Sequence, residues 1–241
     1  MRRLFGTRPS AMSRMAVWLR RALWLPLLLA AYLLTAASWA WLNADALLKQ
    51  VSAESRTLLT ERQTAILLRV EDPNFLTHSG LSVAKGQGLA TISSALARDL
   101  FLYGERLDGA AGALQSLYRV VFNCCKRIDL GRDVMALVVD AKLSKAQQLA
   151  LYAGSVYMGT HDGAQVQGLP DAALRYVDKP LAQLNEQEFI GLVAMIKAPN
   201  QYHPSKAPVE HARRAARIAA LVAGQCQPDG WLDTSFDSCE R

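Results

Sequence analysis

The chain has 241 residues, which is enough for one sizeable domain and an appendage. Its net charge of +6 comes from the N-terminus, because the residues before position 22 include no acidic side chain and six arginines: Arg2, Arg3, Arg8, Arg14, Arg20 and Arg21. The rest of the chain has 21 cationic and 21 acidic side chains and is neutral. This neutrality argues against a nucleic-acid partner, whose phosphates require clustered cations.

An uncharged, strongly apolar stretch runs from Ala22 to Leu42. As a helix it rises roughly 30 Å, the thickness of the hydrocarbon core of a bilayer. Trp24 near one end, and Trp39 and Trp41 near the other, are typical of the two membrane interfaces. The alternative is a cleaved signal peptide, but its apolar region is normally about 7–15 residues long. We therefore predict a transmembrane helix over 22–42.

The arginine-rich flank predicts the orientation of this helix, because cationic segments stay on the cytoplasmic side. Residues 1–21 are then cytoplasmic and the remainder lies outside, which in a bacterium is the periplasmic face of the inner membrane. Residues 43–58 are predicted as a short connecting helix or linker, 59–224 as the main domain and 225–241 as a polar C-terminal tail.

Helical patterns dominate the main domain. Thr60 with Gln63 forms a capping box before an apolar run that ends at Glu71 and Asp72. Further helices are predicted over 91–102, 107–122, 132–142, 144–152, 185–198 and 209–223. Strand-like alternation is almost absent. We therefore expect a mainly helical single domain.

The four cysteines suggest two different environments. Cys226 and Cys239 flank the polar tail and could close a small loop in an oxidising compartment. Cys124 and Cys125 lie in an apolar stretch, which favours buried hydrophobic side chains. No cysteine and histidine spacing resembles a zinc site, so no structural metal is expected.

The ten residues from Glu71 to Gly80 combine two adjacent carboxylates, an aromatic side chain, a histidine and a glycine. An acidic pair at a helix end, next to a turn, is where a general base can meet a substrate. The pattern E-D-x-x-F-x-x-H-x-G resembles the first signature of the peptidoglycan glycosyltransferases. The candidate catalytic residues are Glu71 and Asp72, and the role of His78 is expected to be more structural than catalytic.

This resemblance also implies a fold and a reaction. The family has a lysozyme-like helical domain behind a membrane anchor, and it polymerises lipid II. The glutamate of the motif removes the proton from the 4-hydroxyl of the acceptor sugar. That hydroxyl attacks the anomeric carbon of the growing chain and displaces polyprenyl-pyrophosphate with inversion. By resemblance, Glu71 is the base in this chain.

A second family signature, G-G-S-T-I-T-Q-Q-L-A-K-N-L, is similar to residues 88–100. Arg98 keeps the cation that contacts substrate phosphate in the family. The glutamine pair of the signature is replaced by Ser94 and Ala95. The candidate substrate-binding residues are His78, Thr91, Ser93, Arg98, Lys126 and Arg127.

Two more blocks extend the resemblance to about residues 60–220. Residues 143–159 look like the family's L-S-K-x-x-I-L-x-x-Y-L-N-x-V-Y-F-G, with Gly154 in place of the asparagine. Residues 188–204 resemble its E-A-x-L-L-A-x-L-x-x-A-P-x-x-Y-x-P ending.

The second catalytic glutamate of the family has no clear counterpart. Without gaps, Asp140 falls on a later family acid, and Arg132 stands where that glutamate belongs. A shifted register brings Lys126 and Arg127 onto the family's basic pair, and the displaced acid is then Asp129 or Asp133. The remaining alternative is that neither aspartate serves as the second acid.

The segment between the first two signatures is also short. Only ten residues separate Gly80 from Thr91, where the family carries a longer membrane-embedded segment. The apolar helix over 107–122 either replaces that lipid-facing element or packs on the surface of the core.

Three functions remain open from the residues. The first is an active, divergent glycosyltransferase whose partners are lipid II, the nascent glycan strand and the membrane. The second is a pseudoenzyme that binds lipid-linked glycan or a cell-wall synthesis protein. The third, a lysozyme-like hydrolase, would require two opposed carboxylates. No cofactor is certain, and a divalent cation stays open as the group that replaces the second acid.

Overall fold

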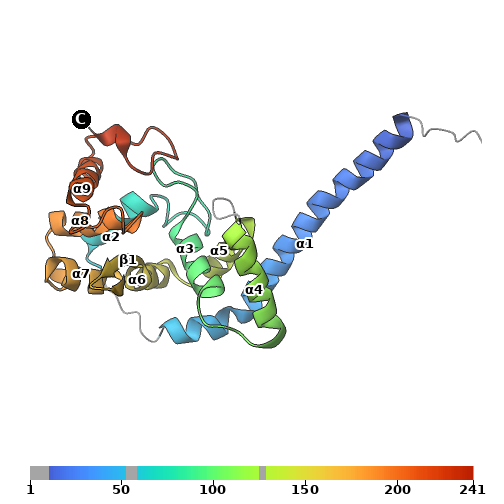
Figure 1. The fold of residues 1–241 in the computed structure, drawn as a ribbon, viewed down its shortest axis with the longest axis horizontal. Coiled ribbons are helices and arrows are strands. Elements are labelled where there is room, and N and C mark those ends of the chain that lie inside the picture. Colours follow the sequence, from blue (N-terminus) through green and yellow to red (C-terminus); the bar gives the residue numbers. More distant parts are fainter. Residues whose placement is uncertain (1–10, 53–58, 125–128, 241) are drawn as a thin grey trace, which may run out of the picture.

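The computed structural model describes residues 11–52, 59–124 and 129–240. Its first element is α1 (Ala11–Ser52), a long helix whose N-terminal half projects away from the rest of the molecule (Figure 1). One stretch of α1, Trp24–Lys49, is long and apolar enough to cross a membrane. The helix runs on without a break through the first part of the predicted connecting segment, so α1 enters the domain directly.

The C-terminal half of α1 belongs to the hydrophobic core. Ala36, Ala40 and Ala44 are fully buried at four-residue spacing, so they form one stripe along the helix. These small side chains let α5 (Leu130–Lys142) approach closely, and α5 and α1 make an extensive contact. Trp39 lies on the same face, and its Nε1 donates a hydrogen bond to the Ala111 carbonyl of α4 (Gly109–Cys124) at 3.0 Å.

The middle of the domain is built from α3 (Ile92–Ala97), which continues into the π-helical turn η1 (Arg98–Leu102), and from α6 (Lys145–Ser155). α3 packs against both α5 and α6. Its inner face carries the buried Ile92 and Leu96. These contacts join the helices α1, α4 and α5 to the other half of the domain (Figure 1).

The other half centres on α8 (Glu186–Ile196), which is buried on nearly all sides. Around it pack α2 (Glu61–Glu71), α7 (Leu169–Val177) and α9 (Pro208–Val222), and a short 3-10 turn, η2 (Leu181–Gln183), leads into it. The mainly helical fold predicted from the sequence is confirmed.

Side-chain capping sets the starts of these helices. Thr60 with Gln63 starts α2, Ser144 with Gln147 starts α6 and Asn185 with Glu188 starts α8, as the sequence predicts. A further capping box, formed by Thr91 and Ser94, starts α3. Each box satisfies backbone N–H groups that the first helical turn leaves without partners.

A β-hairpin stands between α6 and α7, which the sequence analysis missed. β1 (Tyr157–His161) and β2 (Ala164–Gln167) pair antiparallel. Asp162 and Gly163 link them with φ angles of 49° and 80°, the left-handed conformation of a two-residue hairpin loop. The strands are too short for an alternating pattern to emerge, but the Asp-Gly pair was a usable turn signal.

The C-terminal segment folds back onto the domain. Cys226 and Cys239 form a disulfide, which confirms the predicted loop, and Cys239 closes the short 3-10 turn η3 (Asp237–Cys239). The prediction for Cys124 is wrong, because this residue is exposed at the end of α4. The buried side of α4 is formed by Gln115, Tyr118 and Phe122, and Cys124 lies off that stripe. Cys125 lies outside the described residues.

Candidate active site

Glu71 is the last residue of α2, and its carboxylate faces a small cavity. The cavity has a volume of about 230 Å³. Its wall consists of Val70, Glu71, Gly86, Gln87, Gly88, Leu89, Ala90, Lys197, Arg214 and Thr234. From the side of α6, the Tyr152 hydroxyl donates a hydrogen bond to Glu71 Oε2 at 3.3 Å.

The surroundings of Glu71 tune its acidity. Burial raises the pKa of its carboxyl to about 6, and the neighbouring charge of Asp72 acts in the same direction. The charges of Arg214 and Lys197 and the hydrogen bond from Tyr152 oppose this rise. At neutral pH the group is therefore an anion with a basicity well above that of an ordinary glutamate, which suits a general base.

Two cations approach Glu71 from the C-terminal helices. Arg214 of α9 is almost fully buried and donates from Nε to the Ala194 carbonyl at 3.0 Å. Lys197 follows the end of α8, and its Nζ donates to Ser235 Oγ at 2.6 Å. Burial lowers the pKa of both cationic side chains.

Asp72 points away from the cavity and into the fold. It is fully buried, and its Oδ2 accepts hydrogen bonds from the Ile92 backbone N–H at 3.0 Å and from His78 Nε2 at 2.9 Å. Because the Gly80 N–H donates to His78 Nδ1 at 2.9 Å, Nε2 must carry the proton shared with Asp72. Asp72 and His78 thus join the end of α2 to the start of α3.

Thr91 and Ser93 are also engaged inside the protein. Thr91 Oγ1 donates to the Gly80 carbonyl at 2.7 Å, and Ser93 Oγ donates to Gln148 at 2.7 Å. Both side chains are buried. Their contacts hold the loop after α2 and the helix α6 against α3, and neither residue lines the cavity beside Glu71.

A lysine and an aspartate complete the support of this loop. Lys145 Nζ donates to Asp140 at 2.5 Å and to the His78 carbonyl at 2.7 Å, and it lies 4.7 Å from the centroid of the Phe75 ring. Gln148 donates to the same Asp140 at 3.0 Å. The conspicuous motif around Glu71 is therefore fixed from α3, α5 and α6 together.

Arg98 opens the π-helical turn and holds Asp99 in a two-point ion pair, with N–O distances of 2.7 and 3.0 Å. Burial lowers the pKa of Arg98, but this ion pair outweighs it and raises the pKa. The side chain of Arg98 is 43% exposed. Burial and the charge of Glu71 raise the pKa of Tyr152 and the charge of Arg98 lowers it, so both charged side chains lie near this tyrosine.

The family model that describes a transglycosylase matches residues 46–223 of the chain. The chain belongs to the transglycosylase family. It is 32% identical to penicillin-binding protein 1B of Escherichia coli over 162 residues, which cover 66% of this chain and 18% of that protein. It is 29% identical to penicillin-binding protein 1B of Buchnera aphidicola subsp. Acyrthosiphon pisum over 188 residues, 75% of this chain and 24% of the other.

A third relative, penicillin-binding protein 1A of Streptococcus oralis, is 27% identical over 183 residues, which cover 73% of this chain and 27% of that protein. The transglycosylase chain thus spans about a quarter or less of the length of these relatives. The family resemblance inferred from the sequence motifs is confirmed, and the helical domain behind one apolar N-terminal helix is a transglycosylase domain.

The candidates for a second acid lie elsewhere in the transglycosylase domain. Asp129 caps α5 by accepting from the Arg132 N–H at 3.1 Å, and Asp133 pairs with the Arg132 side chain at 2.5 Å. Among the described residues that line the cavity, Glu71 is the one carboxylate. Lys126 and Arg127 lie outside the described residues.

Sequence reasoning missed the two cations and the tyrosine around Glu71. Tyr152 and Lys197 stand inside the two later blocks of family resemblance, which already marked their positions. Arg214 lies outside the segments that resemble the family signatures. Its position in the helix could have identified it, because it shares a buried face of α9 with Ile218 and Leu221. An arginine on an apolar helix face requires a partner inside the fold.

Proposed function

We propose that this transglycosylase domain is a membrane-anchored peptidoglycan glycosyltransferase that polymerises lipid II into glycan strands and releases polyprenyl-pyrophosphate. The observation that carries the proposal is the carboxylate of Glu71, which faces a cavity with its pKa raised to about 6 and with Lys197 and Arg214 beside it. A general base works best when its pKa lies near the working pH. The match to the transglycosylase family model supports the same class of reaction.

In the proposed reaction, Glu71 accepts the proton of the acceptor 4-hydroxyl. The hydroxyl oxygen forms a bond to the anomeric carbon of the growing chain while the bond from that carbon to the pyrophosphate oxygen breaks. The Tyr152 hydroxyl orients the carboxylate. The half-exposed Arg98 is the cation proposed to face the leaving pyrophosphate, where negative charge develops.

Asp72 and His78 act in this proposal as positioning residues, because their hydrogen bonds fix the helix end that carries Glu71. Thr91 and Ser93 support the same loop. Within the described residues, no group of three or more histidine, cysteine, aspartate or glutamate side chains is arranged to hold a metal ion, so no step is assigned to a divalent cation.

The proposed location is the bacterial inner membrane, with one span, a cytoplasmic N-terminus and a periplasmic domain. The apolar stretch of α1 and the arginines before it support this topology. Leu117 and Val120 on the exposed side of α4, a helix that packs against α1, support a contact of α4 with lipid.

A pseudoenzyme that binds lipid-linked glycan or a cell-wall synthesis protein is the second candidate. It is favoured by the composition of the cavity wall, where the described residues place no carboxylate opposite Glu71. Ser94 replaces one glutamine of the family signature, and its hydroxyl accepts from the Thr91 N–H in the capping box of α3.

Incubation of the detergent-solubilised full chain with labelled lipid II separates the two functions. The enzyme predicts glycan polymer from the wild type and from Glu61→Gln, an exposed carboxylate at the start of the same helix, but none from Glu71→Gln. Binding of lipid II without polymer from any of these proteins would leave the pseudoenzyme. Absence of binding as well would reject the enzyme and a pseudoenzyme that binds lipid-linked glycan, and would leave a pseudoenzyme that binds a cell-wall synthesis protein.

A further inference from the structure

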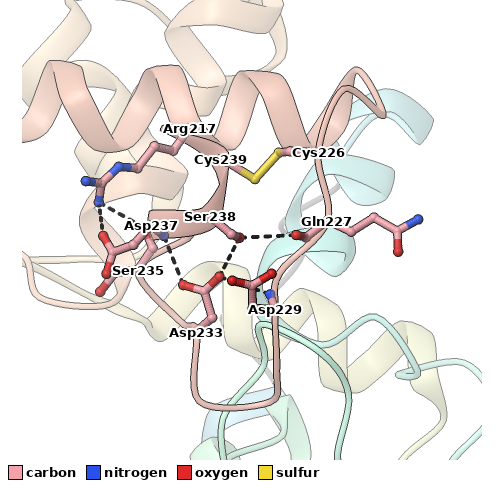
Figure 2. The surroundings of a disulfide bond; sticks show 9 residues. All are labelled: Arg217, Cys226, Gln227, Asp229, Asp233, Ser235, Asp237, Ser238 and Cys239. Atoms are coloured by element: carbon pink, nitrogen blue, oxygen red, sulfur yellow. Dashed lines mark hydrogen bonds and ion pairs between the residues drawn. A yellow bond between two sulfur atoms is a disulfide. The ribbon is translucent and has the colours of Figure 1, made fainter. Parts of the chain in front are cut away.

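The segment closed by the Cys226–Cys239 disulfide is ordered by its own side chains (Figure 2). Asp233 lies at its centre and accepts hydrogen bonds from Ser238 Oγ at 2.6 Å and from the Asp237 N–H at 2.9 Å. Burial raises the pKa of Asp233, but these donors outweigh it and lower the pKa. The segment therefore has a defined internal structure that ends at the disulfide.

The same segment is joined to the turn that forms one wall of the cavity beside Glu71. The Gly86 N–H donates to the Gly230 carbonyl at 2.9 Å, and the Gly88 N–H donates to the Trp231 carbonyl at 2.7 Å. Gly86 has a φ of 80°, and a Cβ there would stand 2.7 Å from the Phe236 ring. The turn therefore adopts its shape in direct contact with the disulfide-closed segment.

Two consecutive residues of the segment also bind both cations that face Glu71. The Thr234 carbonyl accepts from Arg214 Nη1 at 2.9 Å, and Ser235 Oγ accepts from Lys197 Nζ at 2.6 Å. The buried Phe236 ring then lies under the Arg214 guanidinium, with 5.3 Å between the Cζ atom and the ring centroid. Without these acceptors, Lys197 would lose its hydrogen bond to Ser235, and Arg214 would keep its hydrogen bond to the Ala194 carbonyl but lose the one to Thr234.

We propose that the disulfide-closed segment Cys226–Cys239 is a structural wall of the active site, and that Ser235 and the Thr234 carbonyl are positioning groups that hold Lys197 and Arg214 against Glu71. The segment lies beyond residue 223, where the family match ends. The family match therefore assigns no role to this segment. The inference rests on the proposed function only where the formation of polymer is measured. Hydrogen exchange and the titration of Glu71 test it without enzymatic activity.

The first test compares Cys226→Ser/Cys239→Ser with Cys124→Ser, which removes a cysteine outside the disulfide. Hydrogen exchange of the full chain in detergent is followed by mass spectrometry. We expect exchange at Gly86 and Gly88 to become about tenfold faster or more in the double variant, because their two carbonyl acceptors lose their fixed places. Exchange in α8 should stay unchanged and shows that the domain is folded. Unchanged exchange at both glycines would overturn the proposal.

The second test removes one positioning group and leaves the disulfide intact. In Ser235→Ala the Lys197 ammonium loses its acceptor, so less positive charge is held near Glu71 and the pKa of Glu71 rises. Carbon-13 NMR of labelled glutamate side chains should show this rise, and the acid limb of kcat/KM for polymer formation should move to higher pH. Ser235→Thr keeps the hydroxyl and should restore both values, whereas Ser116→Ala on the exposed side of α4 should change neither.

The two proposals fail in different ways. If the wild type makes no polymer, the proposed function fails, and the exchange rates and the titration of Glu71 still test the wall. If polymer forms and neither the exchange at Gly86 and Gly88 nor the titration of Glu71 responds to the variants, the wall proposal fails and the function stands.

Discussion

Glu71 is held in an environment that costs stability when the carboxylate is ionised. An acid whose pKa rises on folding favours its protonated form in the folded state. Folding therefore becomes less favourable as the pH rises from the ordinary pKa of a glutamate to the raised pKa of Glu71, about 6. The groups that reduce this cost are Arg214, Lys197 and Tyr152, and the residue that adds to it is Asp72. A carboxylate kept at a cost is typical of a functional site.

Glu71→Gln should therefore abolish polymer formation and stabilise the protein at the same time. At pH 8 we expect a gain of about 1–2 kcal/mol in the free energy of unfolding, because a neutral amide avoids the penalty on the ionised group. The gain should disappear near pH 4, where the wild-type carboxyl is protonated. Urea unfolding in detergent at both pH values measures it, and a loss of stability at pH 8 would contradict the assignment of burial as the dominant cause.

The pH dependence of wild-type activity follows from the same shift. The base acts only when deprotonated, so kcat/KM for polymer formation should rise with pH through a limb near pH 6. An ordinary glutamate would place this limb near pH 4. Initial rates from pH 4.5 to 8 with labelled lipid II would locate it, and a flat profile over that range would exclude Glu71 as the titrating base.

Tyr152→Phe removes the hydroxyl that donates to Glu71 and leaves the ring in place. The bond is long at 3.3 Å, so we expect a three- to tenfold loss of kcat/KM at pH 6, in the range of about 1 kcal/mol for a modest hydrogen bond. The acid limb should move to higher pH. Tyr157→Phe, whose hydroxyl pairs with Thr160 in the hairpin, serves as the control and should leave the profile unchanged.

Among the elements, the junction between α2 and α3 decides where Glu71 lies. Asp72 joins the two helices through the Ile92 N–H and His78, and its removal would leave those donors buried without an acceptor. We expect Asp72→Ala to cost about 3 kcal/mol of stability. Denaturant unfolding tests this, with Glu105→Ala at an exposed position as the control. Because His78 shares the bond, the costs of Asp72→Ala and His78→Ala should not add.

Several elements were predictable because their determinants are local. Thr60, Ser144 and Asn185 each start a helix with a partner three residues on, and such a pattern is visible in the sequence. The position of Glu71 at the end of α2 was predictable in the same way, whereas its proposed catalytic role rests on the resemblance of its motif. The disulfide was also foreseen, since Cys226 and Cys239 flank one short segment.

The direction of a side chain was not predictable from a motif. Thr91 and Ser93 match positions expected to contact substrate, yet both donate into the fold, because their carbonyl and amide partners come from distant segments. Arg214 was missed for the converse reason, since its role depends on the fold that brings α9 against Glu71. The C-terminal tail was judged polar by composition, although Phe236 is buried at the contact with Gly86.

At the scale of the whole molecule, α1 is both the candidate membrane span and a core helix. Lys142 of α5 strengthens the attachment, because its Nζ pairs with Asp45 at 3.1 Å and lies 4.4 Å from the centroid of the Trp41 ring. The small stripe on α1 leaves no room for larger side chains at the contact with α5.

Ala40→Leu should therefore loosen α1 from the domain. Ala40 is fully buried, so the added side chain overpacks the contact, at a cost of about 1–3 kcal/mol. Ala31→Leu makes the same change on the exposed side of the helix. Thermal unfolding in detergent should show a lower midpoint for Ala40→Leu alone, and equal midpoints for the two variants would contradict the packing described here.

The continuity of α1 also sets the distance of Glu71 from the candidate membrane span. A pocket on a flexible stalk can sample many heights above a bilayer, whereas Glu71 belongs to a domain whose hydrophobic core includes residues of α1, the candidate membrane span. In the proposed function, this arrangement would keep the active site at a constant distance from the membrane surface. It would select the sugar that stands at one set distance from the lipid, and each addition would return the next acceptor to that same level.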